Sequence, residues 1–405
     1  MVTNYSSSYF YNTKYDIDFI LEQLRINLTD PIGNNRTDYS KKNMVNFETE
    51  DIGGEAAFFG RILRVEFTWR NPQNNVQSLV LKLPTVSRAT SFMSGPLKLN
   101  DAEAEAKCSA NMVYLEFAHM NEISFYRTFK EIRDKLLIPR FYFGFPYVKS
   151  DNEGIIAMED MRPTTVVIQP LPGFKLPYLK SLAIYVARLQ HYCAFSGASI
   201  NQFRKDNEKE SICYIQMATH MSKTFVNECR TDLKPFFDKL QHLFTLDNYY
   251  NCVFDKPKFG SSAVVCHGDF WSNNILWKKG PNGEPTPEIG SVVDWQTTHL
   301  GNYCEDLMRA LTLHVSGEER LRITDEILRI YHSTLTELNN GIEPFTFQNV
   351  KQAYKAALPS VTLFMGFGVS MYYYMPSVCP DEAMKEELIS RYKILLLEVI
   401  EEYHL

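Results

Sequence analysis

The sequence predicts an α+β protein in two parts, a β-rich N-terminal part and a mostly helical C-terminal part. Runs with strand patterning dominate residues 50–160, helical spacing dominates residues 161–405, and a proline-rich stretch at 164–175 links them. A chain of 405 residues is long enough to build two domains, each with its own core. We therefore divide the chain into residues 1–160 and 161–405, and expect two lobes with a cleft between them.

The first part is predicted to contain strands and one long helix. Residues 62–69 (ILRVEFTW) alternate apolar and polar side chains, as a strand with one buried face does. Residues 78–83 (SLVLKL) form a second predicted strand, which ends at Pro84. The remaining predicted elements are a helix over 111–130 and short strands over 141–148 and 154–158.

The second part is predicted to be helical, from the spacing of its apolar residues or from strong helix formers. The predicted helices cover residues 179–195, 210–228, 233–243, 304–315, 319–338, 350–357 and 381–404. The apolar run 361–375 follows Pro359 and is too short for a membrane span, so we expect another buried helix there. Residues 263–295 are the exception, because they show short strands joined by loops.

Composition excludes several classes of protein. Lys and Arg number 42 and Asp and Glu 48, and this net charge of −6 argues against a nucleic-acid partner. The eight cysteines form no C-x-x-C pair, and no signal peptide or membrane-spanning segment is apparent in the sequence. We therefore expect a cytoplasmic protein with reduced cysteines. Repeats, tails and charge blocks that would indicate a protein partner are absent from the sequence.

The strongest functional signal lies within residues 263–295. An apolar run leads into the sequence HGD, which ends at Asp269, and Asn274 follows five positions later. A later apolar run ends at Asp294. If the strands between Asn274 and Asp294 pair as a hairpin, all three side chains meet at one end of a small sheet. The alternative is a polar turn between two buried strands.

This set of residues suits phosphoryl transfer. Carboxylate and amide oxygens are ligands that Mg²⁺ prefers, usually together with substrate phosphates. In phosphoryl transfer one Asp orients the attacking hydroxyl, while an Asn and a second Asp hold the metal. A thiol nucleophile at Cys266 is the less favoured alternative, because Cys266 ends an apolar strand and behaves there as a small hydrophobe. The histidines lack the spacing of a zinc enzyme.

The run HGDFWSNN, followed by VVDWQ, resembles the CHK-kinase-like family, also called the ecdysteroid-kinase-like family. This family belongs to the wider group of aminoglycoside phosphotransferases and choline kinases. The resemblance covers roughly residues 50–375 and is densest over 264–309. It implies a two-lobed protein-kinase-like fold, ATP and Mg²⁺ as cofactors, and the hydroxyl group of a small molecule as acceptor.

The resemblance also implies roles for single residues. Asp269 would be the catalytic Asp that orients the acceptor hydroxyl, and Asn274 and Asp294 would be the Mg²⁺ ligands. His267 would brace the loop. Asp306 would hydrogen-bond that loop from the following helix; the alternative is an ordinary Asp at a helix start, where the helix dipole favours it.

The first part supplies candidates for the rest of a nucleotide site. Lys82 lies in an apolar strand, where an unpaired charge is costly, so it needs an anionic partner. Glu122 resembles the family's helix Glu that pairs with the strand Lys and aims it at the phosphates. A solvated Lys and an ordinary helix Glu are the alternative. Gly53 and Gly54, with Gly60 beyond them, would form a phosphate-covering loop, although an ordinary turn fits equally well.

Residues 157–161 (AMEDM) resemble the family's hinge. The backbone from Glu159 to Met161 would bond to adenine, and Met158 and Met161 would be its apolar walls. Tyr372-Tyr373-Tyr374 is either core or a wall for an apolar acceptor.

We therefore expect an ATP- and Mg²⁺-dependent kinase that phosphorylates a small lipophilic, steroid-like or xenobiotic alcohol. One alternative is a choline or ethanolamine kinase, which needs an aromatic and acidic site for a cationic headgroup. A second is a non-catalytic ligand-binding protein on the same scaffold. The presence of Lys82, Asp269, Asn274 and Asp294 argues against this second alternative.

Overall fold

The computed structural model describes the chain in ten segments: residues 10, 13–28, 37–54, 57, 60–72, 75–85, 101–148, 153–203, 208–253 and 263–405. The chain divides into two compact units. The first consists of residues 1–130 and 139–163, and the second of residues 131–138 and 164–405. The segment 131–138, which lies before residue 160, thus packs with the second unit.

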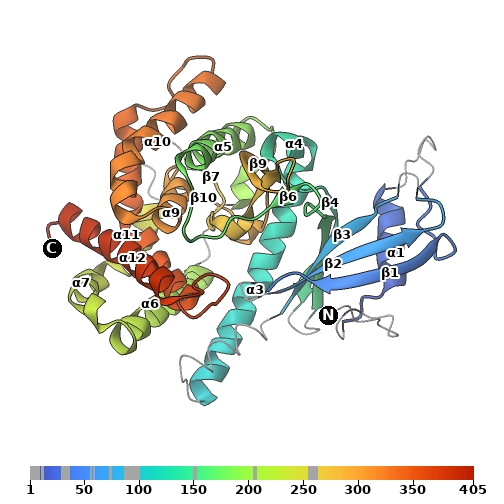
Figure 1. Cartoon of the computed structure of the whole chain (residues 1–405), viewed down its shortest axis with the longest axis horizontal. Coiled ribbons are helices and arrows are strands. Elements are labelled where there is room, and N and C mark those ends of the chain that lie inside the picture. Colours follow the sequence, from blue (N-terminus) through green and yellow to red (C-terminus); the bar gives the residue numbers. More distant parts are fainter. Residues whose placement is uncertain are drawn as a thin grey trace. The chain divides into compact units, whose positions relative to one another are not determined.

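Within the described residues of the first unit, five strands form one antiparallel sheet in the order β1-β2-β3-β5-β4 (Figure 1). The elements are α1 (Ile17–Leu28), β1 (Met44–Asp51), β2 (Gly60–Trp69), β3 (Ser78–Pro84), α3 (Asp101–Phe129), β4 (Phe141–Val148) and β5 (Glu153–Glu159). The predicted strands are present, and the helix predicted over 111–130 is α3, which begins earlier, at Asp101. Helix α1 and strand β1 were not expected from the sequence.

The core of the first unit lies between α1 and one face of this sheet. Ile20 and Leu24 of α1 are fully buried together with Leu79 and Leu81 of β3. Because successive side chains of a strand point to opposite faces, Lys82 lies on the face of β3 opposite to these leucines.

The second unit is mostly helical. Its helices are α4 (Arg133–Leu136), α5 (Leu176–Ala194), α6 (Glu208–Glu228), α7 (Lys234–Leu240), α8 (Leu246–Val253), α9 (Glu305–His314), α10 (Gly317–Leu338), α11 (Phe347–Tyr372) and α12 (Glu382–Glu402). Its strands are β6 (Thr165–Val166), β7 (Val264–Cys266), β8 (Ile275–Lys279), β9 (Pro285–Val292) and β10 (His299–Gly301). The predicted α+β class, with an antiparallel sheet followed by a helical part, is confirmed.

Three strands of the second unit, β7, β8 and β9, lie inside the predicted exception at 263–295, and β10 follows just after it; β6 lies in the predicted linker at 164–175. In the part of the chain that the structure describes, β6, β8 and β9 form one small sheet, and β7 pairs with β10. Helix α5 packs against both β7 and β9. The predicted hairpin is therefore the β8–β9 pair, in which Ile275 lies opposite Val292.

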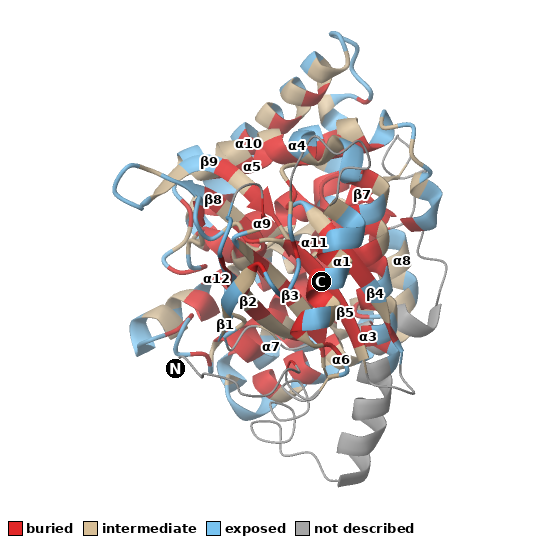
Figure 2. Ribbon diagram, turned by 90° about the vertical axis from the view of Figure 1, so that its right-hand side faces the viewer, coloured by how far each residue is buried: buried red, intermediate tan, exposed pale blue. Residues whose placement is uncertain are grey.

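Helix α11 corrects one prediction. The runs 350–357 and 361–375 were predicted as separate helices, but one helix runs from Phe347 to Tyr372 with Pro359 inside it. A proline in a helix interior removes a backbone hydrogen bond. Residues 357–366 are all buried, and this packing offsets the loss (Figure 2).

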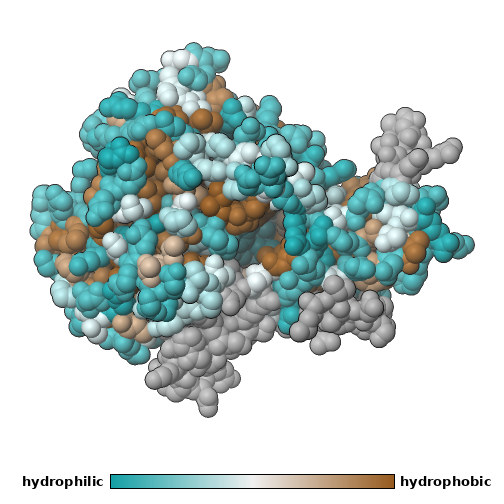
Figure 3. Space-filling model, in the orientation of Figure 1, coloured by the Kyte–Doolittle hydropathy of each residue, from teal (hydrophilic) through white to brown (hydrophobic). Residues whose placement is uncertain are grey.

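None of the helices in the described ranges combines the length and apolar character that a membrane crossing requires. The face drawn in Figure 3 is predominantly hydrophilic, with hydrophobic residues scattered in small groups.

Candidate active site

The loop after β7 is anchored to the start of α9. The Asp306 carboxylate accepts the backbone N–H of His267 through Oδ2 at 2.8 Å and that of Gly268 through Oδ1 at 2.9 Å. This confirms that Asp306 hydrogen-bonds the loop, rather than serving only as a helix-start residue. Complete burial raises the pKa of Asp306 to about 6, with the neighbouring Glu305 acting in the same direction and the two N–H donors opposing it.

Asp269 and Asn274 are in direct contact. The Asn274 Nδ2 donates to the backbone oxygen of Asp269 at 2.9 Å and lies 3.3 Å from its carboxylate Oδ2. The short 3₁₀ turn Ser272–Asn274 returns the chain so that these residues meet. The structure therefore brings together two of the three side chains that the sequence placed at this end of the sheet.

Asp294 is held beside this pair through its neighbour Val293. The Val293 N–H donates to the Asn274 carbonyl at 3.0 Å, and the Val293 carbonyl accepts from His267 Nε2 at 3.0 Å. His267 Nδ1 in turn accepts the Asp269 N–H at 3.2 Å, so the ring carries its hydrogen on Nε2. His267 thus bonds to the backbone on both sides of the site, as a bracing residue would.

Asp294 adopts a left-handed backbone conformation, with φ 67° and ψ 59°. Asp tolerates this region better than most residues, and such strained conformations cluster at functional sites. The Asp294 carboxylate and the Asn274 amide oxygen are hard oxygen donors, a set that suits Mg²⁺.

Arg309, which was not among the predicted site residues, also contacts the Asp269 loop. Its Nη1 donates to the Gly268 carbonyl at 2.6 Å, and its Nη2 lies 3.4 Å from the Asp269 carboxylate. Arg309 follows Asp306 by three positions on α9, so both side chains leave the same helical face. This three-position spacing from Asp306 was the signal in the sequence that could have identified Arg309.

An aromatic group lies close to this loop. Trp271, two positions after Asp269, stacks on Tyr372 with ring centroids 5.0 Å apart. The Arg309 guanidinium lies 5.3 Å from the centre of the Phe364 ring, and Tyr249 packs edge-on to Phe364 at 5.7 Å. Phe364 and Tyr372 both come from α11.

In the first unit, Lys82 and Glu122 form a short ion pair. The Lys82 Nζ lies 2.6 Å from Glu122 Oε2. The Lys82 side chain is 12% exposed and that of Glu122 only 1%, so α3 brings a buried carboxylate to the polar face of β3. The solvated alternative for Lys82 is therefore wrong.

The predicted hinge lies at the end of β5. The Glu159 N–H donates to the Arg140 carbonyl at 2.8 Å, so this N–H already has a partner within the first unit. The buried Asp160 carboxylate accepts from Arg64 Nε at 2.6 Å and from the Ser78 hydroxyl at 2.8 Å. Met161 follows as a half-buried residue.

The predicted glycine loop is described in part. The Gly53 N–H donates to the Asp51 carboxylate at 3.1 Å, and Gly54 has a φ of +56° with nothing near its missing Cβ. Gly60 belongs to β2, where it pairs with Pro84, so it lies outside the loop. Residues 55–56 and 58–59 lie outside the described residues.

Taken separately, the two units have the elements of a protein-kinase-like fold, and a solved structure shares it. The choline kinase from Cryptosporidium parvum matches with a TM-score of 0.52 at 13% identity, over 96% of this chain and 97% of that chain. This likeness shows the fold alone.

The family is shown by the sequence. A model of the family DUF1679, described as "Uncharacterized oxidoreductase dhs-27", matches residues 39–405. The chain therefore belongs to this family.

Two proteins of Caenorhabditis elegans are similar to the chain. The "Uncharacterized kinase-like protein D1044.1" is 27% identical over 305 residues, which are 74% of this chain and 76% of that protein. The "Uncharacterized oxidoreductase dhs-27" is 23% identical over 299 residues, which are 72% of this chain but 35% of that protein. The family, the kinase-like relative and the shared fold confirm the resemblance to the CHK-kinase-like family.

Proposed function

We propose that this protein transfers the γ-phosphoryl group of ATP to the hydroxyl of a small molecule. The observation that carries the proposal is the Asp269 loop, in which Asn274 contacts Asp269 and the backbone of Val293, the residue before Asp294, is hydrogen-bonded to the backbone of Asn274. A polar turn that only joined two strands would not require three oxygen-bearing side chains and an arginine around one loop. The relative that is named an oxidoreductase matches this chain over only 35% of its own length, so we do not transfer its name to this chain.

Asp269 is the residue that acts on the acceptor. Its carboxylate accepts the hydroxyl hydrogen as the hydroxyl oxygen attacks the γ-phosphorus. The new P–O bond forms as the bond to the β-phosphate oxygen breaks, and ADP leaves. Arg309 and Asn274 contact the Asp269 carboxylate from two sides, so they fix its orientation.

Asn274 and Asp294 are the residues that would hold Mg²⁺. The ion would neutralise phosphate charge when bound. The chain's own contribution is to fix both donors through the hydrogen bond between Val293 N–H and the Asn274 carbonyl.

The first unit would supply the remaining nucleotide contacts. Lys82, oriented by Glu122, would bind the α- and β-phosphates, and the backbone at Gly53 and Gly54 would cover them. Because the Glu159 N–H is bonded to Arg140, we assign the adenine contact to the backbone of residues 160–161 and to the carbonyl of Glu159.

The acceptor we propose is a lipophilic alcohol, steroid-like or xenobiotic. The support is the aromatic group, because Trp271 directly follows the Asp269 turn and stacks on Tyr372. Flat aromatic faces bind rigid apolar ring systems by burial of apolar area.

A screen with γ-labelled ATP tests the proposal. The protein is incubated with Mg²⁺ and separate panels of lipophilic alcohols, aminoglycosides, and choline with ethanolamine. We expect label to appear in a lipophilic alcohol. Transfer only to choline or ethanolamine would contradict the acceptor class, and transfer to no acceptor together with no binding of ATP would contradict the proposed function.

The metal assignment has its own test. We expect Asp294→Ala to abolish the Mg²⁺-dependent part of ATP binding measured by calorimetry. The exposed carboxylate Asp238, on α7, provides the control as Asp238→Ala. Unchanged Mg²⁺ dependence in Asp294→Ala would remove Asp294 from the metal site.

A further inference from the structure

A buried chain of polar contacts connects α9 to the Asp269 loop through His299. Glu305 Oε2 lies 3.0 Å from His299 Nε2, and His299 Nδ1 lies 3.0 Å from the Thr297 carbonyl. The Thr297 hydroxyl donates to the His267 carbonyl at 2.9 Å. The side chains of His299 and Glu305 are 4% and 3% exposed, so this pair is shielded from water, whereas Thr297 is half-buried.

Both ring nitrogens of His299 face oxygen acceptors. Nδ1 carries a hydrogen for the Thr297 carbonyl, since a carbonyl cannot donate. A second hydrogen lies between Nε2 and the Glu305 carboxyl group, whichever of the two carries it. Two hydrogen bonds at opposite ends fix both the position and the plane of the imidazole ring.

The fixed ring lies directly against Gly268. A Cβ at Gly268 would come within 2.5 Å of the Thr297 carbonyl oxygen and 3.0 Å of His299 Nδ1. The backbone of Gly268 is also hydrogen-bonded to α9: its N–H donates to the Asp306 carboxylate, and its carbonyl accepts from Arg309. The Gly268 peptide is therefore held by hydrogen bonds from α9 and by the surface that Thr297 and His299 form.

We propose that His299 and Glu305 are positioning residues that hold the Gly268 peptide and thereby aim the Asp269 carboxylate. This inference rests on the proposed phosphotransfer. Through the contacts described above, each acts on Asp269 by way of Thr297, His267 and Gly268. A loosened Gly268 peptide would let Asp269 turn away from the acceptor hydroxyl, and small misplacements of a reacting group cost large factors in rate.

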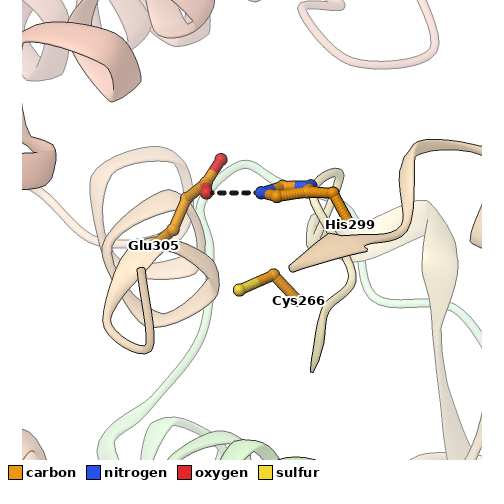
Figure 4. Close-up of side chains that lie close together, drawn as sticks. All are labelled: Cys266, His299 and Glu305. Carbon is orange, nitrogen blue, oxygen red and sulfur yellow. Dashed lines mark hydrogen bonds and ion pairs between the residues drawn. The ribbon is translucent and has the colours of Figure 1, made fainter. Parts of the chain in front are cut away.

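Cys266 lies close enough to the His299–Glu305 pair that a zinc site formed by these three side chains has to be considered. Figure 4 shows Cys266 beside the His299–Glu305 pair, and the three ligand atoms lie within 4.8 Å of one another. Cysteine, histidine and glutamate can all bind zinc, but two ligands on one tetrahedral zinc ion lie about 3.3 Å apart. The 3.0 Å separation of Nε2 and Oε2 suits a shared hydrogen, and Cys266 Sγ already donates to the Asn302 carbonyl at 3.3 Å.

Asn302 supplies the matched control. It lies between His299 and Glu305 in the sequence and is equally buried. Its side chain donates to the carbonyls of Cys252 and Ala353 and does not hydrogen-bond to the Asp269 loop. Asn302→Ala therefore removes buried hydrogen bonds from the same segment without touching Thr297 or Gly268.

Amide hydrogen exchange of the peptide 264–272, compared between variants, tests positioning without reference to activity. In His299→Ala we expect exchange in this peptide at least about tenfold faster than in Asn302→Ala. In His299→Ala, turnover should fall by about tenfold to a hundredfold with KM for ATP unchanged. The separate variant Glu305→Gln, whose amide can still hydrogen-bond to His299, should keep most of the wild-type turnover.

Three outcomes would overturn the proposal. They are equal exchange rates in His299→Ala and Asn302→Ala, equal turnover in both variants, or stoichiometric zinc in the purified wild-type protein that is lost in His299→Ala. If the wild type transfers no phosphate, the proposed function fails, and the exchange experiment still decides whether His299 holds the loop.

Discussion

At the scale of single residues, Gly268 is the position where the backbone of the Asp269 loop is most constrained. Its φ of +81° lies in a region that side chains disfavour, and a Cβ would lie 2.5 Å from the Thr297 oxygen. Gly283 has a similar φ of +85° with nothing within 4 Å of a Cβ. The two glycines therefore separate the cost of the backbone conformation from that of the close contact.

We predict that Gly268→Ala abolishes measurable phosphotransfer, whereas Gly283→Ala keeps it. Gly283→Ala should lower the free energy of unfolding by about 1–2 kcal/mol, the cost of a left-handed conformation for alanine. In Gly268→Ala the new Cβ would also clash with the Thr297 carbonyl oxygen, which is hydrogen-bonded to the buried His299 ring. Gly268→Ala should therefore lower the free energy of unfolding by more than Gly283→Ala does. Urea unfolding and labelled-ATP turnover measure both effects, and an active Gly268→Ala protein would contradict the close packing.

The residues of the site differ in how well the sequence predicts that they meet. Asp269, Asn274 and Asp294 lie within 26 positions on one hairpin, so spacing alone brings their residues near one another. His299 reaches the loop only because β10 pairs with β7, and no local pattern reveals this pairing. Arg309 lies three positions after Asp306 on α9, and its contacts with Gly268 and Asp269 became apparent only in the folded chain.

At the scale of elements, one buried ion pair, Lys82–Glu122, links β3 to α3. Removing one partner of such a pair leaves an uncompensated charge, which costs about 3–5 kcal/mol. Because the Glu122 side chain is only 1% exposed, replacing Lys82 would leave a buried carboxylate without this charged partner.

We predict that Lys82→Met destabilises the first unit by about 3–5 kcal/mol. Lys82→Met combined with Glu122→Leu should recover most of that stability, because no buried charge remains, yet neither protein should bind ATP normally. Lys14→Met is the control in the same unit, since Lys14 is 57% exposed in its pair with Glu153 and should cost under about 1 kcal/mol. A single variant as stable as the wild type would show that Glu122 is solvated.

Elements also differ in how well the sequence predicted them. Strands β2 and β3 bury one face and show clear alternation. Strand β1 has no fully buried residue, so its pattern carries no such signal. Helix α11 was divided at Pro359 because the proline outweighs the pattern locally, whereas burial of the residues around it decides the outcome in the folded protein.

At the scale of the whole molecule, buried histidines link stability to pH. Burial lowers the pKa of His314 to about 3 and that of His119 to about 4. The unfolded chain therefore binds more protons below pH about 6.5, and this stability is lost as pH falls toward 4. Asp306 acts in the opposite direction, because its pKa is raised to about 6 and the folded state binds its proton more tightly.

We predict that the stability difference between wild type and His314→Gln shrinks as pH falls from about 6 to about 4, by about 1.4 kcal/mol per pH unit. The difference isolates His314, because Asp306 contributes equally to both proteins. Urea unfolding followed by tryptophan fluorescence reports mainly on the second unit, which holds three of the four tryptophans, Trp271, Trp277 and Trp295. His242→Gln, an exposed position, should show no such trend. A constant difference between wild type and His314→Gln would mean that His314 titrates normally.

The measurement that bears most directly on the proposed function is the rate of γ-phosphate transfer by Asp269→Asn. Asparagine keeps the shape of the side chain but removes the negative charge that accepts the hydroxyl hydrogen. We predict a loss of at least about a hundredfold in turnover, with ATP binding retained. Turnover equal to that of the wild type would remove Asp269 from the reaction, and with it the assignment of this loop as the active site.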